Sequence, residues 1–300
     1  MISLGTMHLK YIFKEVVRLK TLQELTLLDK FLFDEAMDDP NTYEALLRII
    51  LGDEELKLLT PSQTEKELRT APWLRSIRVD VYSMDDNNIY NTEMQKEYRD
   101  DLVKRTRYYQ ALIDSSLLAP GEVDFNTIKN TTIIMIMPFD LFGKNRYVYT
   151  FEDVCTEDET VKLDDGAKRI FINTHGQNKD DVSPEFIALM RFIEYNEGIE
   201  TQEESAPNLA KIQGRVAEIK ASEEVGVKFM QRWEEEALIR HESKQEGIKE
   251  GISLGEKQGG EKERLSSIRN IMDSMKLTAE EAMKALKIPE SDFEKYMTKL

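Results

Sequence analysis

The sequence predicts an α/β protein with a mixed central sheet flanked by helices and a helical C-terminal tail. Residues 76–96 hold two segments of alternating apolar and polar residues around a polar turn, which is typical of an antiparallel hairpin. Residues 131–137, T-T-I-I-M-I-M, form a continuous apolar run of strand length, as expected of a central strand covered on both faces. Between them, apolar residues of the segment 97–118 recur at helical spacing.

The segment before the hairpin is expected to be mainly helical. A helical segment is predicted at about residues 9–37 and a second helix at about 41–51, with Pro40 ahead of it, where a fixed φ is tolerated. Residues 60–69 and the hairpin would then supply the first strands of the sheet.

The segment after the hairpin is expected to complete the sheet. The helix at about 97–118 ends at the breaker residues Ala119-Pro-Gly-Glu122. Ser183 is a preferred cap and Pro184 a preferred first helical residue, so a helix is predicted from there to about Tyr195. Two further strands are expected, at residues 146–150 and 168–173.

The C-terminal third has a different character. Residues 196–207 are polar and nearly free of large apolar side chains, which indicates a linker. Residues 231–263 are strongly charged, and glycines recur there every fourth residue along one helical face, at positions 247, 251, 255 and 259. Close helix packing and plain flexibility both explain this stripe. Two capping boxes, Thr278-Ala-Glu-Glu281 and Ser291-Asp-Phe-Glu294, predict two short helices at the end.

Three regions are therefore expected: a main α/β domain at residues 1–200, a charged helical or flexible linker at 201–264, and a small helical module at 265–300. The last helix of that module lacks the arginine-rich face and the Asn or Gln side chains of a DNA-reading helix. A protein contact, including self-association, is therefore favoured for the C-terminal helices.

Composition and charge limit the possible partners. The single cysteine, Cys155, excludes an internal disulfide framework and a cysteine-based zinc cluster, which is consistent with a cytoplasmic protein. No run approaches the roughly 18 apolar residues needed to cross a bilayer, so no membrane contact is expected. The net charge of −16 argues against general attraction to a polyanion. A local basic rim around the hairpin is nevertheless possible, formed by Arg69, Arg75, Arg78, Lys96, Arg99, Lys104, Arg105 and Arg107.

The hairpin is expected to set two acids side by side. If its turn is centred on Asp86-Asn87, Met84 pairs with Ile89 and Asp80 lies directly across from Glu93. Facing side chains have Cβ atoms about 4.5 to 5.5 Å apart, and two carboxylates at that distance repel by about 3 kcal/mol at an effective dielectric of about 20. A divalent cation such as Mg²⁺ would offset this repulsion. The alternative is a solvated face on which Asp80 pairs with Arg78 or with a base on a neighbouring strand.

The same residues carry a family resemblance. R-V-D-V at 78–81, followed by Y-N-T-E-M-Q at 90–95, resembles the metal-binding core of the PD-(D/E)XK nuclease superfamily, specifically its nuclease-family transposases, also called recombination-promoting nucleases. The resemblance covers roughly residues 22–200 and implies a restriction-endonuclease-like core. It extends to L-L-D-K-F-L-F-D-E-A-M at 27–37, Q-T-E-K-E-L-R at 63–69, R-Y-Y at 107–109 and T-T-I-I-M-I-M-P-F at 131–139.

The resemblance implies a role for each site residue. Asp80 and Glu93 would coordinate Mg²⁺ or Mn²⁺ with the backbone carbonyl of Met94, and Gln95 takes the place of the superfamily's usual lysine. Because glutamine is neutral, turnover would be slow or would depend on a nearby cation such as Lys96, Arg99 or Lys104. Many members also use an acid from the first helix, for which Glu35 is the first candidate and Glu44 the second.

Two functions follow as expectations. The first is a metal-dependent endonuclease that hydrolyses phosphodiester bonds in DNA and is associated with recombination or a mobile element. The second is a catalytically inactive nuclease-fold protein that binds a protein or nucleic-acid partner. In both, the C-terminal helices would support a homo-oligomer or a protein contact.

Overall fold

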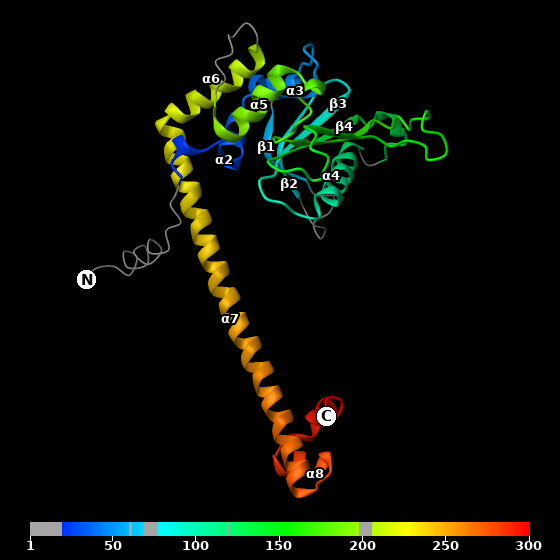
Figure 1. The fold of residues 1–300 in the computed structure, drawn as a ribbon, viewed down its shortest axis with the longest axis vertical. Helices are drawn as coiled ribbons and strands as arrows, with labels where there is room; N and C mark the ends of the chain where they lie inside the picture. Colours follow the sequence, from blue (N-terminus) through cyan, green and yellow to red (C-terminus); the bar gives the residue numbers. More distant parts are fainter. Residues whose placement is uncertain (1–19, 60–61, 69–76, 119–120, 198–205) are drawn as a thin grey trace, which may run out of the picture. The chain divides into compact units, whose positions relative to one another are not determined.

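The computed structural model describes residues 20–59, 62–68, 77–118, 121–197 and 206–300 (Figure 1). The described residues form two compact units, residues 20–229 and residues 230–300. The first unit holds a six-stranded sheet with helices on both faces, which confirms the predicted α/β class. The second holds most of a long helix and two short ones. Among the described residues, no helix combines the length and the apolar character needed to cross a bilayer.

The sheet has the strand order β1-β2-β3-β4-β6-β5. β3, β4 and β6 are parallel to one another, whereas β1, β2 and β5 pair antiparallel with their neighbours, so the sheet is mixed as expected. The carboxyl ends of the three parallel strands therefore meet at one edge of the sheet. The strands are β1 Gln63–Leu68, β2 Ile77–Met84, β3 Asn88–Met94, β4 Asn130–Met137, β5 Val148–Phe151 and β6 Ala167–Asn173.

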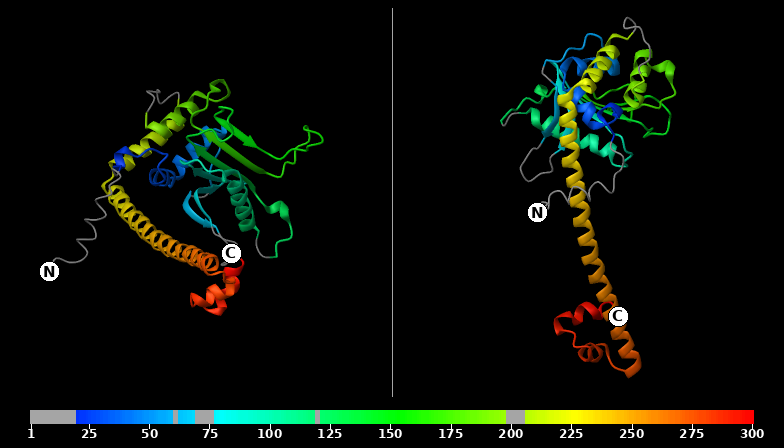
Figure 2. Two further views of the ribbon diagram at one scale, coloured as in Figure 1. Left: turned by 60° about the horizontal axis from the view of Figure 1, so that its bottom comes forward. Right: turned by 90° about the vertical axis from the view of Figure 1, so that its left-hand side faces the viewer.

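Helices cover both faces of this sheet (Figure 2). On one face, Tyr109 and Ile113 of α4 pack in a cluster with Val79 of β2. On the other face, α2, α3, α5 and α6 share a larger core with Val81 and Ile134. The helices of this unit are α2 Lys30–Met37, α3 Pro40–Leu51, α4 Leu102–Leu117, α5 Pro184–Tyr195 and α6 Pro207–Ala221, with 3-10 turns at Leu22–Glu24, Phe125–Thr127 and Lys179–Asp181.

Helix α5 begins where the sequence predicts, whereas α4 and α2 begin later than predicted. Ser183 caps α5, because its Oγ accepts a hydrogen bond from the Phe186 N–H at 3.1 Å. The helix predicted from residue 97 begins only at Leu102, and in the loop before it the Arg99 guanidinium bonds the Asp101 carboxylate (2.7 Å). The helical segment predicted at 9–37 is helical as α2 from Lys30 onward, and residues 1–19 lie outside the described part.

Helix α6 corrects the expected domain boundary near residue 200. Its apolar residues Leu209, Ile212, Val216 and Ile219 recur at helical spacing and are buried in the larger core. Residues 207–221 therefore belong to the sheet unit and not to a linker, and the division between the two units falls after Phe229. Residues 198–205 of the predicted linker lie outside the described residues.

The second unit consists mainly of α7, Glu223–Met275, whose 53 residues begin in the first unit. A small core of Ile268, Ala282, Met283 and Tyr296 joins its end to α8, Ala279–Ala285, and α9, Phe293–Met297. The capping box at Thr278 is present, with the Thr278 N–H bonded to Glu281 Oε2 at 2.9 Å. The box predicted at Ser291 is not formed, because Ser291 lies inside a 3-10 turn, Glu290–Asp292, that runs directly into α9.

Candidate functional site

The site is built on the hairpin of β2 and β3. Met84 pairs with Ile89, and the paired residues continue to Val81 and Thr92, which confirms the predicted register. The turn is held by Asp85, whose Oδ1 accepts hydrogen bonds from the N–H groups of Asn87 (2.8 Å) and Asn88 (2.7 Å). Such an Asx-type turn is a local consequence of the D-D-N-N sequence, so the register follows from nearby residues alone.

Beyond Val81 the two strands are joined through carboxylates. The Asp80 N–H donates to Glu93 Oε1 at 3.0 Å, and the Met94 N–H donates to Asp80 Oδ2 at 3.0 Å. The simple alternation expected along β2 is broken here, because Val79 packs on the α4 face and Val81 on the opposite face. The break lets Asp80 reach across the hairpin, so the two predicted acids do lie together, just beyond the last β2–β3 pair.

Both acids are buried, which makes their charges costly. Asp80 is 7% exposed and Glu93 is 2% exposed. Burial, followed by the charge of Asp80, raises the pKa of Glu93 to about 8, and the Asp80 N–H, Arg105 and Lys30 offset only part of that rise. A negative charge on Glu93 is therefore disfavoured unless a further cation approaches.

Lys30 supplies one cation to this pair. Its ammonium contacts Asp80 Oδ1 directly and lies 3.4 Å from Asp34 Oδ2 and 3.9 Å from Glu65 Oε1. Burial acts against the charged form, but the charges of Asp80 and Asp34 outweigh it and raise the pKa of Lys30. Lys30 is the first residue of α2, a position that places it beside Asp80 of β2, and no motif of the sequence points to it.

Arg105 supplies the second cation, from α4 on the opposite face. Its Nη2 lies 3.5 Å from Glu93 Oε2, and its Nη1 donates to Gln95 Oε1 at 3.0 Å. Its Nε donates to the hydroxyl of Tyr109 at 2.6 Å. Gln95 thus shares the Arg105 guanidinium with Glu93, and its amide oxygen is engaged by that guanidinium.

The acid that the first helix brings to the site is Asp34 and not Glu35. Asp34 is 4% exposed and shares the Lys30 ammonium with Asp80, whereas Glu35 forms its ion pair with Lys228 of α7. Successive residues of a helix point about 100° apart, and of these two Asp34 is buried whereas Glu35 is only partly buried. Glu44, the second candidate, lies elsewhere and pairs with Arg48 (2.6 Å).

The predicted basic rim is partly neutralised. Lys96 pairs with Asp29 at 2.8 Å and Arg99 with Asp101 at 2.7 Å, so neither contacts the acid pair. Lys104 and Arg107 are exposed on α4. Arg69, Arg75 and the side chain of Arg78 lie outside the described residues.

The donor set fits a hard divalent cation such as Mg²⁺. Two carboxylates are the number that Mg²⁺ commonly takes from a protein, with the remaining ligands drawn from water and phosphate oxygens. Among the described residues, no group of three or more His, Cys, Asp or Glu side chains is arranged to hold a metal ion. The described side chains therefore do not supply a third such ligand to the two acids. The role of the Met94 carbonyl stays a prediction.

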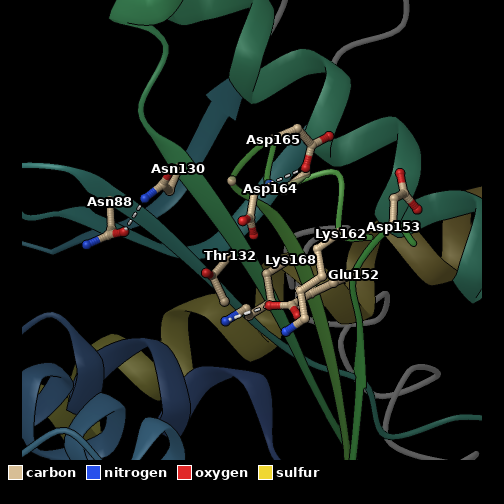
Figure 3. A pocket seen from close by; sticks show the side chains of 11 residues that line it. Asn88, Asn130, Thr132, Glu152, Asp153, Lys162, Asp164, Asp165 and Lys168 are labelled. Carbon is tan, nitrogen blue, oxygen red and sulfur yellow. Dashed lines mark hydrogen bonds and ion pairs between the residues drawn. The ribbon is translucent and has the colours of Figure 1, made fainter. Parts of the chain in front are cut away.

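A separate cavity of about 290 Å³ lies near the other end of the parallel strands (Figure 3). Asn88 and Asn130, at the starts of β3 and β4, line it, and Glu93 lies roughly 16 Å further along β3 at about 3.3 Å per residue. Its polar side chains bond one another: Asn130 Nδ2 donates to Asn88 Oδ1 (3.1 Å), and Lys168 pairs with Glu152 (2.9 Å). This cavity is therefore not part of the acid pair's site.

Comparison of the chain with models of protein families, with curated proteins and with solved structures gives no match. A function must therefore be argued from the chemistry of the site and from the resemblance of its residues.

Proposed function

We propose that this chain is a metal-dependent endonuclease that hydrolyses phosphodiester bonds in DNA. One observation carries the proposal: just beyond the last β2–β3 pair, the Asp80 N–H donates to Glu93 Oε1 and the Met94 N–H donates to Asp80 Oδ2, both at 3.0 Å, with Glu93 2% exposed. Burying two acids next to each other, at a break in the strand pairing, lowers the stability of the fold. Such pairs are commonly found where the acids bind a cation. The resemblance to PD-(D/E)XK nucleases supports DNA as the substrate and is the sole support for a link to recombination or a mobile element.

Each residue of the site would have a defined task. Asp80 and Glu93 would hold the cation, with the Met94 carbonyl as a third oxygen. A bound Mg²⁺ or Mn²⁺ would polarise the phosphodiester and lower the pKa of a water next to it. Gln95 would orient that water through its amide group, and Asp34 would add negative charge from α2. Lys30 would give up its contact with Asp80 Oδ1 when the cation binds, since both need the same oxygen.

The test is a plasmid nicking assay with and without Mg²⁺. The wild-type chain is expected to convert supercoiled DNA to open circles in the presence of Mg²⁺, and Asp80→Ala is expected to reduce nicking to background while circular dichroism stays unchanged. Asp181→Ala is the matched control, because Asp181 is an exposed acid paired with Arg146. Nicking at the wild-type rate by Asp80→Ala would remove the assignment.

A second candidate function is a catalytically inactive nuclease-fold protein that binds a protein or a nucleic acid. The ion pairs of Lys30 and Arg105 favour it, because they already reduce the cost of the two buried acids without any metal. Calorimetry separates the two candidates. Binding of Mg²⁺ or Mn²⁺ that is lost in Glu93→Ala favours the nuclease, and absence of binding to the wild-type chain favours the inactive module.

A further inference from the structure

We infer that Arg105 is a positioning residue of this site: its guanidinium fixes the Gln95 amide and the Glu93 carboxylate and supplies the positive charge that a lysine at position 95 would otherwise bring. The inference rests on the proposed nuclease function and assigns a task to a residue that the family pattern does not name. It is drawn from three contacts of one side chain.

The guanidinium is fixed from three directions. Nη1 donates to Gln95 Oε1 at 3.0 Å, Nε donates to the Tyr109 hydroxyl at 2.6 Å, and Nη2 lies 3.5 Å from Glu93 Oε2. Its Cζ also lies 5.1 Å from the centre of the Tyr109 ring, and Tyr109 is buried. Arginine can make such a set of contacts because its donors form a rigid planar fork, which a lysine ammonium lacks.

The orientation of the Gln95 amide follows from these partners. Arg105 has donors only, so it must face the amide oxygen, and the carbonyl oxygen of Glu97 is an acceptor only, so it must face the amide nitrogen (2.5 Å). Both partners require the same orientation of the Gln95 amide, which removes the usual ambiguity between its oxygen and its nitrogen. The amide therefore holds one further N–H in a fixed direction.

The same contacts explain why position 95 carries no lysine. A lysine ammonium at this position would meet the Arg105 guanidinium, two positive charges at about hydrogen-bond distance, whereas the glutamine oxygen accepts the bond. Arg105 reaches the site from α4, one turn before Tyr109 on the same helix face. The positive charge that a lysine at position 95 would carry thus comes from Arg105 of α4.

The experiment compares Arg105→Gln, Gln95→Lys, and the two changes together, in the full chain. Arg105→Gln is expected to lower kcat for Mg²⁺-dependent nicking roughly tenfold to hundredfold, with KM for DNA changed by less than about threefold. Gln95→Lys alone is expected to lower kcat, because it sets a second cation beside Arg105. The double variant is expected to recover most of the lost kcat, because the charge is restored at position 95.

Arg240→Gln is the matched control, since it removes the same charge from an exposed residue of α7 that is paired with Glu236, and its kcat is expected to equal that of the wild type. A wild-type kcat in Arg105→Gln, or a raised kcat in Gln95→Lys alone, would overturn the inference and leave the nuclease function standing. The Gln95→Lys result tests the inference even if Arg105→Gln does not fold. A wild-type chain that neither binds Mg²⁺ nor nicks DNA would overturn the nuclease function, and the role of Arg105 with it.

Discussion

At the residue scale, Glu93 is a buried carboxylate whose negative charge is energetically unfavourable. It is 2% exposed, and it lies close enough to Asp80 for their charges to interact. Lys30 and Arg105 approach the acid pair from opposite faces of the sheet and reduce this cost. The four side chains therefore form one electrostatic unit, in which a change at any member alters the others.

The raised pKa of Glu93 gives the metal-free protein a distinct pH dependence. The unfolded chain releases this proton near pH 4.5, whereas the folded chain holds it until about pH 8. Between those values the unfolded state binds fewer protons, so the free energy of unfolding falls as pH rises. Glu93→Gln cannot ionise and is expected to flatten the fall. Urea unfolding of both proteins in EDTA at pH 5, 6, 7 and 8 measures it.

The control for this prediction is Asp181→Asn. A hydrogen bond from Asn178, followed by the charge of Arg146, lowers the pKa of Asp181, so this acid titrates below the whole window. Its variant should keep the wild-type slope between pH 5 and 8. Equal slopes for Glu93→Gln and the wild type would show that Glu93 is ionised in the folded protein at neutral pH.

The sequence could predict part of this site and not the rest. The register that joins Asp80 to Glu93 depends on a four-residue turn and on strand alternation, both local. The choice of Asp34 over Glu35 depends on how α2 is rotated against the sheet, which a pattern of adjacent acids does not contain. Arg105 was counted in a basic rim, but its contacts with Gln95 and Glu93 depend on the placement of α4.

At the element scale, α7 contains an unusual stripe of glycines. A Cβ added at Gly251 or Gly255 would meet nothing within 4 Å, so within the described residues no contact requires a glycine there. Glycine costs about 0.5 to 1 kcal/mol relative to alanine inside a helix. The middle of α7 is therefore less stable as a helix than its length suggests.

Replacing Gly251 and Gly255 together by alanine is expected to stabilise α7 by roughly 1 to 2 kcal/mol. The measurement is the helical circular dichroism signal at 222 nm during thermal unfolding. Gly52→Ala is the matched control: it too has open space around it, but φ is +66°, so alanine should cost roughly 1 to 2 kcal/mol there. A loss of helix stability in the double variant would mean that the stripe packs closely against a second molecule.

Elements also differed in how well their sequence predicted them. The apolar run of β4 could be identified because a strand covered on both faces needs no polar alternation. Helix α6 falls within the predicted linker, because its four buried apolar residues stand among charged ones and follow a polar segment. Its apolar residues recur with the helical period of 3.6, but the polar composition around them is also typical of a linker.

At the scale of the whole molecule, the two units have separate apolar cores. The larger core includes strand and helix residues up to Phe229, whose ring lies 5.0 Å from that of Phe31. The smaller core lies wholly between Leu265 and Tyr296. The site residues and the partners described for them all precede residue 230. The first unit therefore contains both the larger core and the acid pair with its partners.

A chain that ends after Phe229 is therefore expected to keep the thermal transition of the sheet unit and, under the proposed function, its Mg²⁺-dependent nicking. A chain that ends after residue 205 is the contrasting variant, because it loses α6. Burial of the four apolar side chains of α6 contributes roughly 6 to 12 kcal/mol, which is comparable with the whole stability of a domain. Calorimetric unfolding of both chains should show a cooperative transition in the longer one and none in the shorter. Loss of the transition in both would mean that the folding of the sheet unit depends on residues 230–300.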